Sequence, residues 1–205
     1  MFINFWYPAG RSTDIIGTPV RRRMLAQDFV LWRDGTGQAH CLANTCIHRG
    51  ASLADGKVRD GEVQCPYHGW RFAGDGRCTA IPSLGKHARI PGRARVDAYP
   101  VKEKYGLVFV FLGDLPEEQR CPIMEIAEYR GDQPDPGWRA TIQHFEWDID
   151  YQRSIENGLD GAHNEFVHPT HGYSGNRDDI RIAVEDYEIV DTDWDSGHFS
   201  RRRAP

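Results

Sequence analysis

Two cysteines and two histidines in two similar short loops constrain this sequence more than any other feature. The loops read Cys46-Ile47-His48-Arg49-Gly50 and Cys65-Pro66-Tyr67-His68-Gly69-Trp70. As a pattern this is C-x-H-x16-C-x2-H, so each loop offers one thiolate and one imidazole. Such a set suits a [2Fe–2S] cluster in which two cysteines hold one iron and two histidines hold the other. Neutral imidazoles reduce the negative charge of the cluster, which raises its reduction potential.

Two other interpretations compete with the iron–sulfur cluster. Zinc also accepts two cysteines and two histidines, but finger-type spacing places the cysteines together and the histidines together. Here each pair is mixed. The second alternative is that these residues lie near each other by coincidence. Gly50 and Gly69 after the pairs, and Pro66 inside the second pair, favour tight loops around a bound group. Ligand type and spacing therefore favour the cluster over zinc or coincidence.

C-I-H-R-G and C-P-Y-H-G-W, as they stand here, resemble the Rieske domain of ring-hydroxylating oxygenases and their demethylating relatives. These proteins are the terminal oxygenase alpha subunits of Rieske non-haem iron systems. The resemblance covers most of the chain. It implies an α+β protein, in which a small antiparallel β Rieske domain with a [2Fe–2S] cluster at one end precedes the start of a helix-grip-type catalytic domain. The implied cluster ligands are Cys46, His48, Cys65 and His68.

Composition narrows the class of protein further. The chain has 205 residues, of which 40 % are hydrophobic and 27 % charged, as in an ordinary globular protein of one or two domains. A formal net charge of −5 gives no reason to expect nucleic acid. The longest apolar run, Leu107–Leu112, is too short for a membrane span, and no secretory signal is visible. Cys41, Cys78 and Cys121 read as free thiols of a reducing compartment, so we expect a cytoplasmic location.

The first half of the chain reads as many short strands. Runs rich in β-branched and aromatic residues flank Gly-rich turns within residues 29–43 and 70–80, which indicates two hairpins. Residues 106–112 form a continuous apolar run that predicts a buried strand. A polar, proline-marked break follows. We therefore expect a Rieske domain at residues 1–115 and the first part of a catalytic domain at residues 116–205.

The second half begins with helical periodicity. Tyr151, Ile155 and Leu159 recur every fourth residue and can share one helix face. Pro169 should end that helix at or before His168. The strands expected around the helix are Trp138–Trp147, Ile180–Val184 and Tyr187–Val190.

A second candidate metal site follows this periodic segment, in the pattern Asn157-x-x-Asp160-x-x-His163-x4-His168. Asp160 and His163 share a helix face, and His168 can turn toward them if the helix is interrupted. Two histidines and one carboxylate form the facial triad of non-haem Fe(II) oxygenases, which leaves open positions for oxygen and substrate. Two surface histidines would be the default interpretation of this spacing alone. Downstream of the cluster motif, we expect a mononuclear iron.

The order of the two motifs also resembles the family. By position, His163 and His168 correspond to imidazole ligands of the mononuclear iron, Asp160 to the acidic residue that bridges the two metal sites, and Asn157 to a position close to the iron. In the family this bridge runs between subunits. The resemblance therefore implies that His68 bonds Asp160 of the next subunit, which in turn bonds His163. Similarity to members that lack a β subunit implies a homotrimer.

The third iron ligand of the family is an Asp or Glu far downstream, and no residue before Pro205 stands at that position. We therefore expect the N-terminal part of a longer polypeptide. The expected function is a terminal oxygenase component that uses O2 and electrons from NAD(P)H, delivered by a reductase with or without a ferredoxin. It would hydroxylate, dihydroxylate or oxidatively demethylate an aromatic or other cyclic small molecule. The alternative is a Rieske-type electron-transfer protein without oxygenase chemistry.

Overall fold

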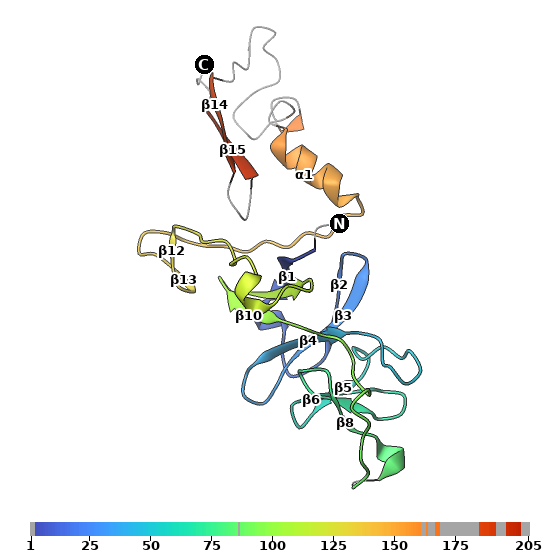
Figure 1. The fold of residues 1–205 in the computed structure, drawn as a ribbon. Helices are drawn as coiled ribbons and strands as arrows, with labels where there is room; N and C mark the ends of the chain where they lie inside the picture. Colours follow the sequence, from blue (N-terminus) through green and yellow to red (C-terminus); the bar gives the residue numbers. More distant parts are fainter. Residues whose placement is uncertain are drawn as a thin grey trace. The chain divides into compact units, whose positions relative to one another are not determined.

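The computed structural model describes residues 3–85, 87–160, 163, 167–168, 185–191 and 196–201. It divides into two compact units, Met1–Trp138 and Arg139–Pro205. Antiparallel strands build the first unit, while the described part of the second contains a helix and a hairpin (Figure 1). In the described part of the chain, every helix is too short or too polar to cross a membrane.

Three antiparallel sheets organise the first unit, with strand orders β1-β11-β10, β2-β3-β4-β9 and β5-β6-β7-β8, and a small β12-β13 ribbon follows. The third sheet carries the second cluster loop between β6 and β7. The elements are β1 (Phe5–Arg11), η1 (Ser12–Asp14), β2 (Val20–Met24), β3 (Gln27–Arg33), β4 (Ala39–Ala43), β5 (Lys57–Arg59), β6 (Glu62–Gln64), β7 (Arg71–Phe72), β8 (Cys78–Ala80), η2 (Pro82–Leu84), β9 (Ala98–Tyr99), β10 (Val101–Lys104), β11 (Leu107–Leu112), η3 (Glu117–Gln119), β12 (Tyr129–Arg130) and β13 (Gln133–Pro134).

Both predicted hairpins are confirmed, as β3–β4 and β7–β8. The turn of the first depends on Asp34, whose carboxylate accepts hydrogen bonds from the amides of Thr36 (2.8 Å) and Gln38 (3.1 Å). An aspartate that bonds the backbone ahead of it in this way stabilises a tight turn. The predicted apolar strand is β11, which lies between β1 and β10 and is almost wholly buried.

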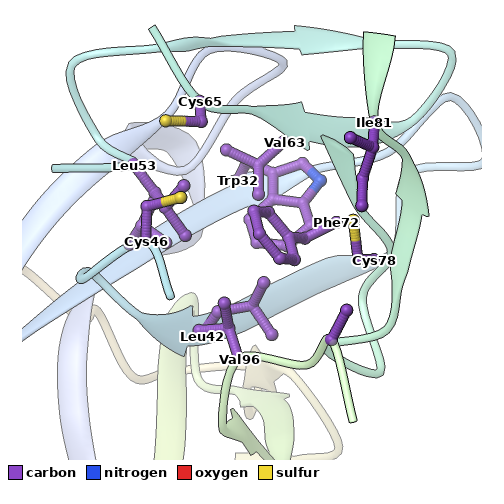
Figure 2. Packing of buried hydrophobic residues seen from close by; sticks show 12 residues of the cluster. Trp32, Leu42, Cys46, Leu53, Val63, Cys65, Phe72, Cys78, Ile81 and Val96 are labelled. Carbon is purple, nitrogen blue, oxygen red and sulfur yellow. The ribbon is translucent and has the colours of Figure 1, made fainter. Parts of the chain in front are cut away.

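The core beneath the cluster loops is centred on Trp32, which is fully buried with Val63 and Phe72. The indole Nε1 of Trp32 donates to the carbonyl oxygen of Gly61 (3.0 Å), so its polar atom is satisfied within the core. Figure 2 shows the sulfur atoms of Cys46 and Cys65 together on one side of this cluster of side chains. The core therefore forms a rigid base from which both cluster loops project.

The linker after β11 packs against the β domain, while the predicted domain boundary near residue 115 stays a prediction. Trp6 Nε1 donates to the carbonyl oxygen of Cys121 (2.8 Å). The Tyr105 hydroxyl accepts from the amide of Ile126 (2.9 Å) and lies 3.0 Å from the carbonyl oxygen of Met124, to which it donates. Residues 116–138 therefore belong to the first unit. The polar composition of residues 116–138 gave no sign of these contacts, because the partners Trp6 and Tyr105 lie in other segments of the sequence.

The second unit confirms the predicted helix as α1 (Tyr151–Leu159), with the Asp150 side chain capping it by accepting from the Gln152 amide (2.9 Å). The predicted strand at Trp138–Trp147 is wrong: residues 139–147 have no strand structure. A strand needs a hydrogen-bonded neighbour, and this segment pairs with no strand in the described part of the chain. The hairpin strands are β14 (Glu185–Asp191), which confirms the strand predicted at 187–190, and β15 (Ser196–Arg201); the prediction at 180–184 lies outside the described residues.

One ion pair in the first unit predicts a pH-dependent stability. Arg33 contacts both carboxylate oxygens of Glu103 (2.6 and 3.0 Å) and also donates to backbone carbonyls, including that of Ile15. The hydrogen bond from Arg33 holds the pKa of Glu103 below its ordinary value. A lowered folded-state pKa contributes stability above the unfolded pKa, and this is lost as the pH falls through the folded pKa.

We expect Glu103→Gln to lower the free energy of unfolding at pH 7 by about 1 kcal/mol, a small value because the pair is partly exposed. The difference from the parent protein should shrink as the pH is lowered past the ordinary carboxyl range. Urea unfolding at pH 7 and at about pH 3 measures it. Glu117→Gln, on the exposed η3 turn, is the matched control and should change stability little at either pH. A difference for Glu103→Gln that is independent of pH would contradict the role of the ion pair.

Candidate metal centres

The two cluster loops have the same backbone geometry. The amide of Gly50 donates to the carbonyl oxygen of Cys46 (2.9 Å), and the amide of Gly69 donates to that of Cys65 (3.1 Å). In each loop the cysteine amide also donates, over 2.8 Å, to the carbonyl oxygen of the residue after the glycine. Gly50 and Gly69 have φ values of 73° and 72°, in the left-handed region that other residues seldom adopt. The glycines noted in the sequence therefore close two equivalent turns.

These turns bring the four predicted ligands together in two pairs. Cys46 and Cys65 are buried, and their thiols share a hydrogen bond. His48 and His68 lie on the exposed side, with ring centroids 4.5 Å apart. The two thiols therefore lie beside each other, and so do the two imidazoles. This pairing is required when one iron is held by two cysteines and the other by two histidines. Among the described residues, no three His, Cys, Asp or Glu side chains converge as ligands of one metal ion.

The electrostatic surroundings of these residues suit a bound cluster. Burial raises the pKa of the Cys46 thiol to about 11, while the backbone amides of His48 and Arg49 donate toward the sulfur and act in the opposite direction. Desolvation, followed by repulsion from His68 and Arg49, lowers the pKa of His48. A histidine must be neutral to ligate a metal, and amides directed at sulfur are a known means of tuning iron–sulfur centres. The residues present therefore fit the cluster.

Aromatic rings support both histidines. Trp70 stacks on His48 with ring centroids 4.6 Å apart and an interplanar angle of 6°. The ring of Tyr67 lies 3.9 Å from that of His68. Stacking on this scale limits the rotation of each imidazole. The supporting role of Trp70 was not predicted, because its partner belongs to the other loop and the sequence does not show which residue it faces.

Asn44 is a further positioning residue that sequence reasoning missed. It is almost fully buried, and its side-chain oxygen accepts from the amide of Ala54 (2.8 Å). Its side chain also bonds Ser52, and its carbonyl oxygen accepts from the amide of Leu53 (2.8 Å). These bonds tie together the two ends of the loop that carries Cys46. The only available signal was a polar amide two residues before that cysteine, which is too common to be diagnostic.

We expect Asn44→Ala to lower the free energy of unfolding by about 1–3 kcal/mol, because the amide of Ala54 loses its buried acceptor. The sulfide content per chain should fall with it, since the first cluster loop is no longer held closed. Thermal unfolding and acid-labile sulfide measure the two effects. Asn44→Asp retains the acceptor and should lose less of both. Full sulfide and unchanged stability in Asn44→Ala would contradict the positioning role.

Residues of the second motif also lie close to one another in the structure. Asp160 caps the C-terminal end of α1, and its Oδ2 lies 3.3 Å from Nδ1 of His163. The two atoms are within ion-pair distance, but their orientation is not that of a hydrogen bond, so the buried Nδ1 has no hydrogen-bond partner among the described residues. The rings of His163 and His168 lie 5.4 Å apart. Because α1 ends at Leu159, the interruption comes before His163, earlier than predicted, and His168 can return toward it.

His163 thus lies beside a carboxylate and a second imidazole, which are ligand types of a mononuclear iron site, although the three side chains do not converge on one point among the described residues. Asn157 lies on the exposed surface of α1, one turn before Asp160.

Comparison with known proteins identifies the domain that carries the first candidate site. Residues 5–100 match the family model of the Rieske [2Fe-2S] domain. The chain is 34 % identical to the 3-chlorobenzoate-3,4-dioxygenase oxygenase subunit of Comamonas testosteroni, over 80 % of this chain and 37 % of that one. It is 39 % identical to the phenoxybenzoate dioxygenase subunit alpha of Ectopseudomonas oleovorans, over 91 % and 48 % of the two chains. The chain belongs to the Rieske oxygenase family.

A solved structure supports the same assignment to the Rieske oxygenases. Dicamba monooxygenase bound to 3,6-dichlorosalicylic acid is 25 % identical, with a TM-score of 0.72 over 93 % of this chain and 53 % of that one. Dicamba monooxygenase has also been solved with non-haem iron. The family match supports the expected Rieske [2Fe–2S] cluster, while non-haem iron is recorded for dicamba monooxygenase.

The individual metal ligands of this chain remain predictions supported by geometry. The chain spans between 24 % and 48 % of the length of the curated relatives compared with it. Those relatives include chloroplast proteins, such as TIC 55 of Pisum sativum, so the cytoplasmic location also stays a prediction.

Proposed function

We propose that this chain is part of the terminal oxygenase component of a Rieske non-haem iron system. The observation that carries the proposal is the presence of two separate ligand sets in one chain. The first pairs Cys46 with Cys65 and His48 with His68. The second groups Asp160 with His163 and His168. A simple electron carrier needs only the first set.

In the first site, Cys46 and Cys65 would hold one iron and His48 and His68 the other. When bound, the cluster stores one electron and delivers it to the oxygenase site. The backbone amides of His48 and Arg49 direct their dipoles at the Cys46 sulfur, which stabilises its negative charge. Trp70 keeps the His48 ring in one orientation.

In the second site, His163 and His168 would hold an Fe(II) ion. When bound, that iron provides open positions where O2 and substrate meet. The Asp160 carboxylate lies beside Nδ1 of His163. A hydrogen bond between them, made after a small rotation of the ring, would keep the ring proton on Nδ1 and leave the lone pair of Nε2 free for the metal. Asn157 lies one helical turn before Asp160.

The proposed reaction uses O2 and electrons that pass from NAD(P)H through a separate reductase. It hydroxylates, dihydroxylates or oxidatively demethylates an aromatic or other cyclic small molecule. Relatives named for 3-chlorobenzoate, phenoxybenzoate, chlorophyllide and a methylsterol support a cyclic substrate. We further propose a homotrimer in which His68 of one subunit approaches Asp160 of the next.

Metal analysis of the anaerobically purified chain tests the proposal. We expect about three irons and two sulfides per chain, with a Rieske EPR signal after reduction by dithionite. About two irons and two sulfides would favour the alternative, a Rieske-type electron-transfer protein. A colourless protein with zinc and no sulfide would overturn the assignment of both sites.

A further inference from the structure

The segments that carry the two cluster loops meet at one end of the β5–β6 hairpin. β5 follows the first cluster loop and β6 precedes the second, and the last pair of their ladder is Lys57 with Gln64. Gly56 comes directly before this pair in the chain, and Cys65 comes directly after it. The separation of the two loops is therefore determined where Gly56 faces the end of β6.

The backbones of Gly56 and Gln64 are so close that only glycine fits at position 56. A Cβ atom added to Gly56 would overlap the carbonyl oxygen of Gln64 and would lie 3.0 Å from the carbonyl oxygen of Leu53. Both oxygens belong to the backbone and cannot rotate away as the end of a flexible side chain can. Gly56 is not one of the glycines with a positive φ angle, so the requirement here is for space between two backbones.

Hydrogen bonds connect Gly56 to the first cluster loop. Its amide donates to the carbonyl oxygen of Leu53 (3.0 Å), and the Leu53 amide donates to that of Asn44 (2.8 Å), two residues before Cys46. The Leu53 side chain is fully buried in the core that also contains Cys46 and Cys65. Figure 2 shows it on the side of the core where both sulfur atoms lie. The position of Gly56 is thus coupled to that of Cys46.

Gln64 connects the same contact to the second cluster loop. Its carbonyl group, which faces Gly56, forms the peptide bond to Cys65. Its side-chain Nε2 donates to the carbonyl oxygen of Gly69 over 3.5 Å, on the other side of the loop and next to His68. A displacement of Gln64 therefore moves the second pair of candidate ligands relative to the first.

We propose that Gly56 is a positioning residue for the iron–sulfur cluster, because it sets the separation of the two loops that carry the ligands. The inference rests on the proposed function and deepens it by naming a residue that binds no metal itself. Cys46 and Cys65 would share one iron, and ligand distances at a metal vary by only about 0.2 Å. A side chain at position 56 forces the two backbones apart, so the ligands of the two loops no longer reach the same cluster.

Gly56→Ala tests this role, with Gly76→Ala as the matched control. A Cβ atom added to Gly76 would also overlap a backbone carbonyl oxygen, that of Val96, and the φ angle of 83° at Gly76 adds strain. The control should therefore lose at least as much stability as Gly56→Ala. Figure 2 shows Val96 at the end of the core away from Cys65, so the clash in the control does not lie between the cluster loops.

Acid-labile sulfide, the EPR g-values and the reduction potential of the anaerobically purified proteins measure the placement of the ligands. We expect Gly56→Ala to retain less than about half of the parent's sulfide, and the remaining cluster to have shifted g-values and a shifted potential. Gly76→Ala should retain about two sulfides per chain with the g-values and potential of the parent. Circular dichroism and thermal unfolding report whether each variant has the native fold.

The outcomes separate this inference from the proposed function. A parent chain without sulfide would overturn the proposed function and the inference together. With the cluster present in the parent, unchanged sulfide and g-values in Gly56→Ala would overturn the inference alone. Equal losses of sulfide in the two variants would do the same, because reduced stability would then explain both. Loss of the native fold in Gly56→Ala would also contradict the positioning role, because it would show that Gly56 is required by the whole domain.

Discussion

Cys65→Ala is expected to abolish the iron–sulfur cluster, whereas Cys78→Ala should leave it intact. Both cysteines are buried in the same core cluster, at 3 % and 8 % exposure. The two substitutions remove the same atoms, so their packing costs should be similar, about 1–2 kcal/mol. Cys65, however, meets Cys46 at the end of the core, while the Cys78 sulfur lies 3.5 Å from the carbonyl oxygen of Ala80. The difference between the variants therefore isolates the role of metal ligand.

Acid-labile sulfide, iron content and the EPR spectrum of the reduced protein measure this difference. Cys65→Ala should contain almost no sulfide, and Cys78→Ala should retain about two sulfides per chain. The unfolding temperature should fall further in Cys65→Ala, because a cluster bound only by the folded state adds its binding free energy to stability. Equal cluster content in the two variants would show that the core, and not the thiolate of Cys65, determines assembly.

The local features of the first unit were predictable because they depend on neighbouring residues. Turns depend on aspartate and glycine, and the hairpins around Asp34 and Gly76 could therefore be read from the sequence. The strand Leu107–Leu112 is apolar throughout because both of its faces are buried. The ligand types at the cluster could be predicted for the same reason, since the pattern lies within two short loops.

The remaining features depend on contacts between residues that are distant in sequence. The packing of residues 116–138 within the first unit could not be read from the sequence, because it depends on contacts with Trp6 and Tyr105. The strand predicted at Trp138–Trp147 failed because amphipathic sequence alone does not provide a pairing partner.

At the second site the sequence predicted a helix but not the geometry of the residues that follow it. A helix over Tyr151–Leu159 was expected, but the position of its end was not. That end matters because residues five apart, as His163 and His168 are, point in different directions on a regular helix. With the break placed before His163, the two rings come within 5.4 Å of each other. The approach of the two rings is therefore a consequence of where the helix stops.

His163→Ala is expected to remove the mononuclear iron and leave the Rieske cluster intact. His163 contacts both Asp160 and His168, so its loss removes one imidazole ligand and the link to the carboxylate. Iron should fall from about three to about two per chain, while sulfide remains at about two. His144→Ala, at an exposed histidine of the same unit, is the matched control and should retain all the iron.

The readouts for His163→Ala separate three interpretations of the second motif. Loss of one iron with an unchanged Rieske EPR signal supports an independent mononuclear site. If the iron content stayed at about three, His163 would not be a ligand. If sulfide and the Rieske signal disappeared together with the iron, the two motifs would assemble as one unit. Because the cluster ligands lie in Met1–Trp138 and His163 lies in Arg139–Pro205, each with its own packing, we expect the two metals to be lost separately.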